Sequence, residues 1–195
     1  MRTLASLAAL AFLAGCATPA YVSPVEVTRF TGDQPAALGR GPIAVVTAPG
    51  ADANSFESAA FQAAVSQELA QLGYIVTGDR AQQVAEVSVQ RFVAQAGGRR
   101  SPVDVGVGGS TGSYGSGVGM GIGINLGGRP ADSIDTELRV VIKPSGGVNA
   151  LWEGRARFSA TTNSDYADQR AAAGKLADAL FTGFPGRSGE TIEVR

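Results

Sequence analysis

The alternation of apolar and polar residues predicts four β-strands in this chain, because neighbouring side chains of a strand point to opposite faces of a sheet, and a continuous apolar run predicts a fifth. The predicted strands are residues 25–30, 42–46, 84–93, 135–143 and 151–158. We expect residues 25–30 to form an edge strand. Residues 42–46 are a continuous apolar run of the length of a buried strand.

The last two strands predict an antiparallel hairpin in which one sheet face is wet. The apolar positions of each strand share one face and its charged positions share the other, and residues 144–147, Pro-Ser-Gly-Gly, predict the turn between them. The apolar positions are Thr136, Leu138, Val140 and Ile142 in the first strand and Trp152, Gly154, Ala156 and Phe158 in the second.

Apolar residues at steps of three and four predict two helices. The first has Phe61, Val65, Leu69 and Leu72 on one face. Asn54 and Glu57 resemble a capping box at its start, and Gly73 is suited to end it. The second has the stripe Ala173, Leu176, Ala177, Leu180, Phe181 and Phe184. We expect Pro185-Gly186 to terminate it and residues 187–195 to be a frayed polar tail.

Residues 97–128 form a glycine-rich insertion that holds 13 of the 27 glycines. Apolar residues alternate with glycine, Asp104 or Asn125 from Val103 to Val107 and from Val118 to Leu126, which predicts a β-hairpin with its loop near residues 109–117. Three interpretations stay open at this point. The hairpin packs on the rest of the domain, it is a mobile insertion, or it is a surface for a partner, a lipid or self-association, the last because flat glycine-rich strands are weakly specified in register. Insertion of the strand pair into a membrane would require several copies.

The N-terminus carries the strongest chemical signal of the sequence. Arg2 precedes an apolar run over residues 4–13, which is shorter than the roughly 20 residues of a membrane-spanning helix and is typical of a secretory signal. The run ends in Leu13, Ala14, Gly15 and Cys16, which closely resemble the lipobox of bacterial lipoproteins. The resemblance implies that the Cys16 sulfur receives a diacylglyceryl group, that the chain is cut before Cys16, and that the new N-terminus is acylated. The alternative is an ordinary signal peptide with an incidental cysteine.

Composition narrows the classes of function. Cleavage after residue 15 leaves 180 residues, enough for one domain, and 44% of the chain is hydrophobic. The formal net charge is −1 and no basic block is present, so nucleic acid is not an expected partner. The chain has no histidine, and its only cysteine is Cys16, so the commonest general base and the usual transition-metal ligands are missing. We therefore expect no enzyme, no metal and no cofactor.

Four features of the sequence suggest chemistry only weakly. Gly108–Gly112 matches the G-x-S-x-G hydrolase pattern around Ser110, but no helix start follows and no histidine exists to activate the hydroxyl. Asp132 and Asp135 could hold calcium or work as acid and base, although a polar turn is an ordinary place for them. We expect Trp152 to be a core residue and Arg99-Arg100 to be a solvated pair.

The order of elements resembles the bacterial lipoprotein family catalogued as Domain of Unknown Function 4136. The resemblance covers residues 25–186, and the Leu-Gly-Tyr and Trp-x-Gly landmarks carry most of it. The segments concerned are residues 43–46, 69–74, 85–89, the glycine-rich insertion, residues 151–156, and the last helix closing on Phe184-Pro185. The resemblance implies an α+β fold, with an antiparallel β-sheet covered by two main α-helices, and it carries over no catalytic residue.

The domain organisation expected from these observations is a signal peptide at 1–15, a lipidated tether at 16–24, the α+β domain at 25–186 and a polar tail at 187–195. An Asp directly after the lipidated cysteine favours retention of a lipoprotein at the inner membrane. In this chain Ala17 and Thr18 follow Cys16, so that Asp is missing. The expected location is therefore the periplasmic face of the outer membrane.

Two functional hypotheses follow. The first is a non-enzymatic, membrane-anchored envelope lipoprotein that binds an envelope protein or another envelope component through its sheet or its glycine-rich hairpin. The alternative is a carrier of a lipid or another apolar small molecule between sheet and helices. The oligomeric state stays open.

Overall fold

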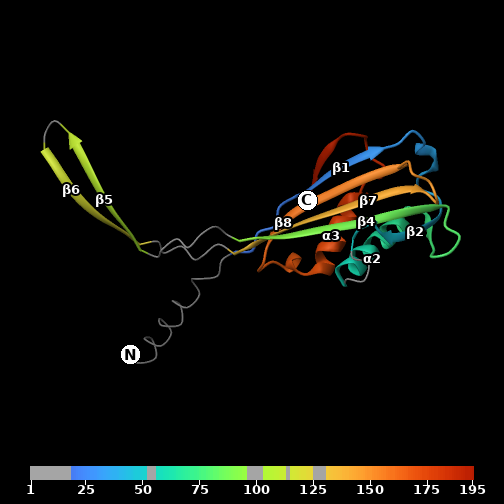
Figure 1. The fold of residues 1–195 in the computed structure, drawn as a ribbon, viewed down its shortest axis with the longest axis horizontal. Helices are drawn as coiled ribbons and strands as arrows, with labels where there is room; N and C mark the ends of the chain where they lie inside the picture. The colour runs from blue at the N-terminus through green and yellow to red at the C-terminus, as the bar shows by residue number, and fades with distance from the viewer. Residues whose placement is uncertain (1–18, 52–55, 96–102, 113–114, 125–130) are drawn as a thin grey trace, which may run out of the picture. The chain divides into compact units, whose positions relative to one another are not determined.

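The computed structural model describes residues 19–51, 56–95, 103–112, 115–124 and 131–195 (Figure 1). The chain divides into two units. The larger contains residues 20–94 and 132–195, and the smaller contains residues 95–131 together with the first 19 residues.

The larger unit is built on a seven-stranded sheet of order β3-β2-β4-β7-β8-β1-β9. Its strands are β1 (Val25–Thr31), β2 (Gly41–Thr47), β3 (Tyr74–Val76), β4 (Gln83–Ala94), β7 (Ser133–Pro144), β8 (Trp152–Thr161) and β9 (Thr191–Val194). The predicted hairpin is confirmed: β7 and β8 pair antiparallel from Ser133 opposite Thr161 to Ile142 opposite Trp152. The amide of Gly147 donates to the Pro144 carbonyl at 2.9 Å and closes the predicted turn.

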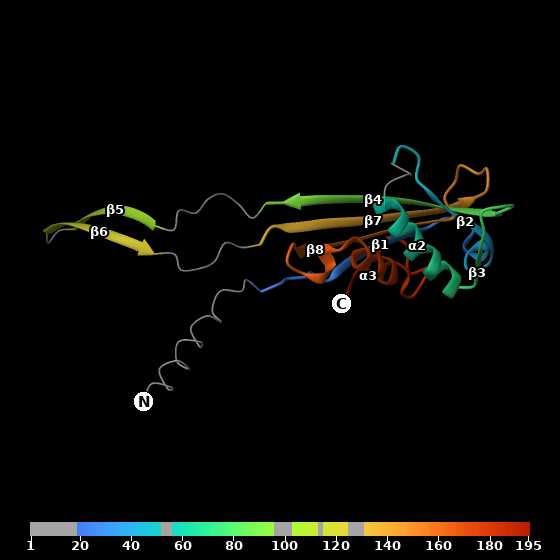
Figure 2. The ribbon, with the colours of Figure 1, turned by 90° about the horizontal axis from the view of Figure 1, so that it is seen from below.

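Two helices, α2 (Phe56–Gln71) and α3 (Gln169–Phe181), lie on the same side of this sheet (Figure 2). Short 3-10 helices occur at Pro35–Ala37 and Asp165–Ala167. The predicted α+β class with two main helices is confirmed. Within the described ranges, no helix combines the length and the apolar character needed to cross a bilayer.

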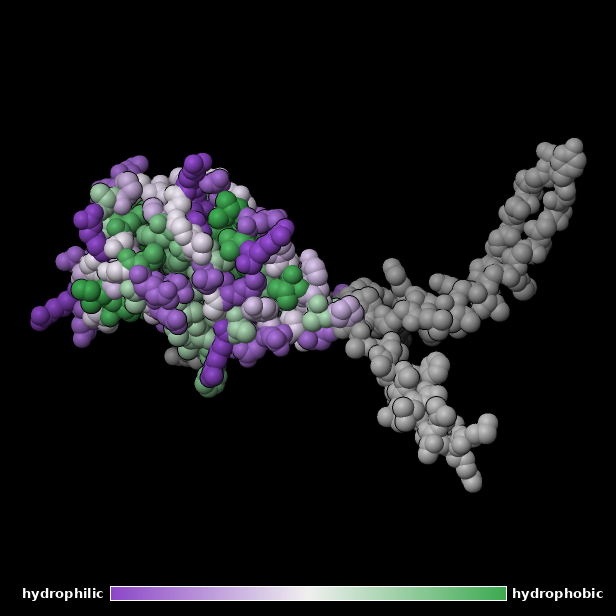
Figure 3. All heavy atoms as spheres, turned by 180° about the vertical axis from the view of Figure 1, so that it is seen from behind, coloured by the Kyte–Doolittle hydropathy of each residue, from purple (hydrophilic) through white to green (hydrophobic). Residues whose placement is uncertain are grey.

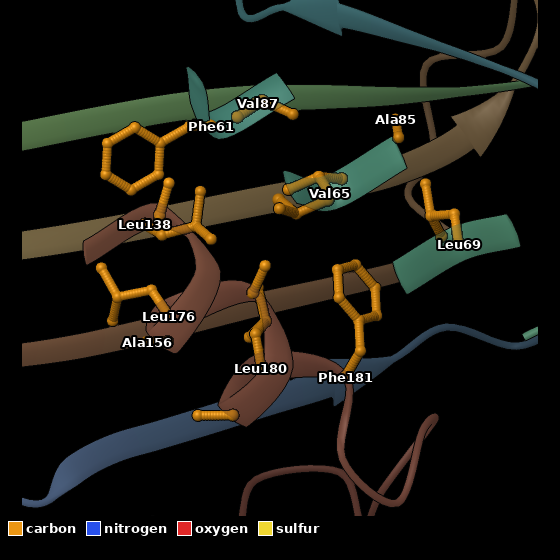
Figure 4. Packing of buried hydrophobic residues seen from close by; sticks show 14 of the residues in the cluster. Phe61, Val65, Leu69, Ala85, Val87, Leu138, Ala156, Leu176, Leu180 and Phe181 are labelled. Atoms are coloured by element: carbon orange, nitrogen blue, oxygen red, sulfur yellow. The ribbon is translucent and has the colours of Figure 1, made fainter. Parts of the chain in front are cut away.

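The core lies between the sheet and the two helices (Figure 4). The predicted face of α2 is confirmed, since Phe61, Val65 and Leu69 are fully buried and Leu72 packs partly buried against them. The alternation of β7 is confirmed as well, because the positions predicted to be apolar on that strand are at most 1% exposed. Period-two patterning therefore identified the core face of the sheet correctly.

The Trp-x-Gly landmark has a packing explanation. Trp152 is fully buried, stacks on Phe181 with ring centroids 5.5 Å apart, and donates its Nε1–H to the Pro185 carbonyl at 2.9 Å. A Cβ on Gly154 would overlap Cη2 of Trp152 and lie 2.8 Å from Cδ1 of Leu180. Gly154 is therefore the residue that lets the indole lie across the strand beneath α3.

The Leu-Gly-Tyr landmark ends α2. Gly73 has φ +99°, a conformation that L side chains rarely adopt, and it turns the chain from the helix into β3. The hydroxyl of Tyr74 then accepts a hydrogen bond from the Gly39 amide at 2.8 Å. The proposed cap residue Asn54 lies outside the described residues.

Pairing at one edge of the sheet differs from the expected antiparallel arrangement. β2 is parallel to β3 and to β4, because α2 carries the chain back across the sheet between β2 and β3. Parallel neighbours need such a crossover, so the sheet is mixed.

The expectations for the two chain ends of the domain were wrong. β1 is not an edge strand, because it lies between β8 and β9. Residues 187–195 are not simply a polar tail, because Thr191–Val194 forms β9, whose Ile192 and Val194 pack against the core. Helix α3 ends at Phe181 rather than at Pro185, and Phe184 packs on Trp152 from beyond the helix with centroids 5.1 Å apart.

The smaller unit contains the predicted glycine-rich hairpin. β5 (Val103–Gly112) and β6 (Gly115–Ile124) pair antiparallel in a two-stranded sheet of their own. The strands reach further than expected and leave only residues 113–114 between them, so the predicted loop at 109–117 was too long. The register places Val103 opposite Ile124, Val105 opposite Ile122 and Val107 opposite Met120, so that apolar residues pair with apolar ones.

Candidate functional site

The face of the sheet that the helices leave uncovered carries charged side chains. Ion pairs link neighbouring strands across it: Glu26 of β1 with Arg157 of β8 at 2.8 Å, and Lys143 of β7 with Glu86 of β4 at 2.6 Å. The opposite side, on which the helices lie, shows hydrophobic residues interspersed with hydrophilic ones (Figure 3). We call the uncovered side the open face.

The centre of the open face holds a three-residue charge cluster. Glu153 Oε1 accepts from Arg139 Nε at 2.9 Å and from Arg155 Nη2 at 3.0 Å. The hydrogen bond from Arg139 holds the pKa of Glu153 below its ordinary value of 4.5, partial burial acts in the opposite direction, and Arg155 adds to the lowering. The carboxylate form of Glu153 is therefore the favoured form in the folded chain.

This shift predicts a pH-dependent effect of the Glu153→Gln substitution. Because the folded state lowers the pKa, Glu153 stabilises the fold above pH 4.5, and this contribution is lost as the pH falls through the folded pKa. We expect Glu153→Gln to reduce the free energy of unfolding by at most about 1 kcal/mol at neutral pH, since the pair is partly exposed. Urea unfolding of both chains should show this gap closing in acid, and a gap that is the same at both pH values would contradict the assignment.

A hollow of about 500 Å³ lies on the open face near the start of β7. One row of side chains crosses it, because Glu137 of β7 is opposite Arg157, Arg157 is opposite Glu26, and Glu26 is opposite Glu193 of β9. Asp135 and Phe92 also line the hollow. Its charged lining thus consists of four carboxylates and one guanidinium.

The guanidinium is already occupied by one of these carboxylates. Arg157 donates from Nη2 to both Glu26 oxygens, at 2.9 and 2.8 Å, and from Nε to Oε2 at 3.1 Å. These hydrogen bonds, followed by the charges of Glu26 and Glu137, raise the pKa of Arg157. Asp135 accepts a hydrogen bond from the Ser159 hydroxyl. Neither Glu137 nor Glu193 forms an ion pair within the described part of the chain, so the hollow carries surplus negative charge.

The arrangement suits the binding of a cation more than it suits catalysis. A carboxylate without an ion pair attracts an ammonium or guanidinium group, and Phe92, which is 61% exposed, offers a ring face for the same charge. Among the described residues, no group of three or more acidic, histidine or cysteine side chains is placed to hold a metal ion.

The structure places the candidate residues of the sequence in different settings. Asp135 lines the hollow, while Asp132 precedes β7 and has its carbonyl bonded to the Thr162 amide at 2.8 Å. Trp152 is a core residue, as expected. Ser110 lies within β5, where the structure describes the backbone alone. Outside the described residues lie Leu13, Ala14, Gly15, Cys16, Arg99 and Arg100.

The row of Glu137, Arg157, Glu26 and Glu193 was missed from the sequence. Alternation had assigned Glu137 and Arg157 to a wet face, but Glu26 and Glu193 join them only through the pairing of β1 with β8 and β9. The signal that could have found this row is the polar residue at every second position, Glu26 and Thr28 in one segment and Thr191 and Glu193 in the other, read together with the correct strand order.

Three further hollows lie along the described part of the chain. One adjoins the first hollow at Thr28 and Arg155, one lies beside the end of α3 at Thr182 and Gly183, and one lies at the β7–β8 turn near Asn149. None of these four hollows is lined by a residue of α2 or α3, and the side chains between these helices and the sheet pack together. They therefore give the carrier hypothesis no support.

Comparisons with known proteins add little on function. No family model matches the chain. An uncharacterized protein of Zymomonas mobilis is 35% identical over 72 residues, which are 37% of this chain, and the match spans only 27% of that protein's length.

Two solved structures are similar to this chain at low TM-scores. The PelC dodecamer from Paraburkholderia phytofirmans has a TM-score of 0.45 at 11% identity, covering 84% of this chain and 99% of that one. A PDZ domain protein from Parabacteroides distasonis has a TM-score of 0.44 at 14% identity, covering 97% of this chain and 42% of that one. We infer no function from these likenesses, and membership of the lipoprotein family stays a prediction.

Proposed function

We propose that this chain is a membrane-anchored lipoprotein of the bacterial envelope that binds a partner through the open face of its sheet. The observation that carries the proposal is the hollow around Arg157, in which Glu137 and Glu193 have no ion pair among the described residues, on a face that neither α2 nor α3 covers. Glu193 lies directly opposite Glu26, and like charges in that position destabilise a sheet.

The anchor rests on the sequence. Leu13-Ala14-Gly15-Cys16 ends the apolar N-terminal run, and Cys16 is the only cysteine, so its modification leaves no thiol in the folded domain. Two or more acyl chains give stable attachment, since each buried methylene contributes about 0.8 kcal/mol. The resemblance to the lipoprotein family supports the same reading, with the periplasmic face of the outer membrane as the proposed location.

The partner that fits the hollow is a protein segment bearing lysine or arginine. The surplus carboxylates attract its charge, and the exposed ring of Phe92 provides a cation–π contact and apolar cover for its methylene stem. We propose binding rather than catalysis because the chain supplies no imidazole and no thiol beyond Cys16.

Photo-crosslinking in intact cells tests the proposal. A crosslinking residue at Thr28, on the open face beside the hollow, is compared with one at Gln67, exposed on the outer side of α2. We expect a specific adduct from Thr28. Replacing Glu137 and Glu193 by lysine should lower its yield about tenfold or more, because like charges facing each other at an interface cost several kcal/mol.

Two controls make the result decisive. Asp79→Lys makes the same reversal of charge, from −1 to +1, at one site in an exposed turn outside the lining of the hollow, and it should leave the adduct intact. Glu137→Gln with Glu193→Gln removes the charge without adding repulsion and should give an intermediate yield. Equal adducts from Gln67, or a yield unchanged by charge reversal, would refute binding at the hollow.

A further inference from the structure

We infer that one end of the sheet, the end carrying Tyr21, Phe92 and Val93, rests on the surface of a lipid bilayer. This inference rests on the proposed lipid anchor at Cys16. It goes further in naming the part of the folded domain that meets the membrane and the kind of lipid surface that it meets.

The end is defined by backbone pairing. Ala94, the last residue of β4, is opposite Ser133, the first residue of β7, and Ser133 is opposite Thr161, the last residue of β8. The chain enters the domain at the same place, because Tyr21 and Thr161 exchange hydrogen bonds. The Tyr21 amide donates to Thr161 Oγ1 at 2.9 Å, and the Thr161 amide donates to the Tyr21 carbonyl at 2.9 Å. We call this the tether end of the sheet.

Large apolar side chains are exposed at the tether end. Tyr21 is 59% exposed, Phe92 61% and Val93 64%. Phe92 and Val93 are neighbours on β4 and point to opposite faces of the sheet, so apolar surface is present on both sides of this end.

Exposure alone does not distinguish the two ends of the sheet. Ile75 on β3 is 65% exposed and Val148 in the β7–β8 turn is 92% exposed, and both belong to the opposite end. The length of chain between the anchor and the domain does distinguish them.

Only five peptide units separate Cys16 from Tyr21. A fully extended chain spans at most about 3.6 Å per residue, so Tyr21 lies within about 18 Å of Cys16. The twelve residues of β7 extend about 40 Å from the tether end to the turn. The anchor thus confines the tether end to the membrane surface, whereas it leaves the opposite end unconstrained.

The side chains at this end suit an uncharged lipid interface. Tyrosine is favoured where an apolar layer meets headgroups, and the Val93 side chain gains free energy by entering the apolar side. Asp135 is exposed at this end, and the residues opposite it, Phe92 on β4 and Ser159 on β8, are not basic. Anionic headgroups would therefore repel its carboxylate. The surface proposed is therefore one of zwitterionic phospholipid.

Spin labelling of the full-length, lipidated chain tests this inference. Because lipidation occupies the Cys16 sulfur, a cysteine introduced at Val93 or at Ile75 is the single free thiol, and these two positions are matched in exposure. Each variant is labelled with a nitroxide and reconstituted into vesicles of phosphatidylethanolamine and phosphatidylcholine. Collisions with oxygen, which partitions into lipid, and with a water-soluble nickel complex are then measured.

We expect the collision rate with the nickel complex to be lower at V93C than at I75C by a factor of about three or more. The reason is that interfacial side chains are buried about 5–10 Å into the headgroup boundary. Equal nickel accessibility at the two positions, on a chain that floats with the vesicles, would overturn the membrane contact and leave the anchor intact. A purified full-length chain that carries no lipid and does not float with the vesicles would overturn the anchor, and this inference with it. The two failures are therefore distinguishable.

Discussion

Replacing Trp152 by alanine is expected to lower the free energy of unfolding by about 3–5 kcal/mol, a typical cost for deleting a fully buried aromatic side chain. The indole is fully buried and contacts the rings of Phe181 and Phe184. Its removal also leaves the Pro185 carbonyl without its 2.9 Å donor. Urea unfolding followed by far-ultraviolet circular dichroism measures the loss without relying on tryptophan fluorescence.

The matched control is Trp152→Phe, which keeps an aromatic ring and removes the Nε1–H. We expect it to cost about half as much as Trp152→Ala, because most of the ring contacts survive. A loss below about 1 kcal/mol for Trp152→Ala would show that the packing around the indole is not the centre of the core.

Replacing Arg29 by methionine is expected to cost about 2–4 kcal/mol, because hydrogen bonds from a charged donor contribute about 1.5–3 kcal/mol each and the loss is partly offset by the removed cost of burying the charge. Arg29 is 5% exposed and donates to the carbonyls of Leu180 and Ala179 at 3.0 Å and of Thr182 at 2.8 Å. It thereby satisfies the C-terminal end of α3, where the helix dipole favours a positive charge. Burial lowers the pKa of Arg29, and the charge of Glu190 raises it.

Arg29→Lys separates charge from geometry. Lysine retains the positive charge but lacks the planar fork that reaches three carbonyls, so we expect a stability between those of the wild type and Arg29→Met. Urea unfolding of the three chains measures this order. A methionine variant as stable as the wild type would show that the end of α3 does not depend on Arg29.

Those parts of the fold with a regular pattern could be predicted from the sequence. In β7 and β8 the core residues fall at every second position, and the turn between them has its own sequence signal, so both strands and their pairing were correct. The prediction of the apolar face of α2 was also correct, because its core residues recur at steps of three and four.

Other parts of the fold could not be predicted because they depend on distant pairing. β9 has only four residues, too few for a pattern, and it is stabilised by lying beside β1, more than 160 positions earlier in the chain, as the Thr28–Thr191 contact shows. Without β9, β1 was placed at the sheet edge. The parallel pairing of β2 depends on the path of α2, which local patterning does not reveal.

The candidate site was unpredictable for a related reason. Glu26, Glu137, Arg157 and Glu193 come from four strands, and only the register of the sheet brings them into one row. By contrast, Cys16 is identified by its neighbours in sequence, and the structure describes none of them. The anchor and the open face are thus proposed on independent grounds.

The two proposals together give one geometric account. Phe92 lines the hollow and belongs to the tether end, so a partner bound in the hollow would be held close to the membrane surface. The surplus carboxylates would then select a cationic segment at that height above the bilayer.

The central claim of this account is that the chain is attached to the membrane through Cys16. The most direct measurement is the mass of the N-terminal peptide of the chain isolated from the cell envelope. We expect a peptide that begins at Cys16, carries a diacylglyceryl group on the sulfur and is acylated at its amino group. A peptide that begins elsewhere, or a Cys16 with an unmodified thiol, would contradict it.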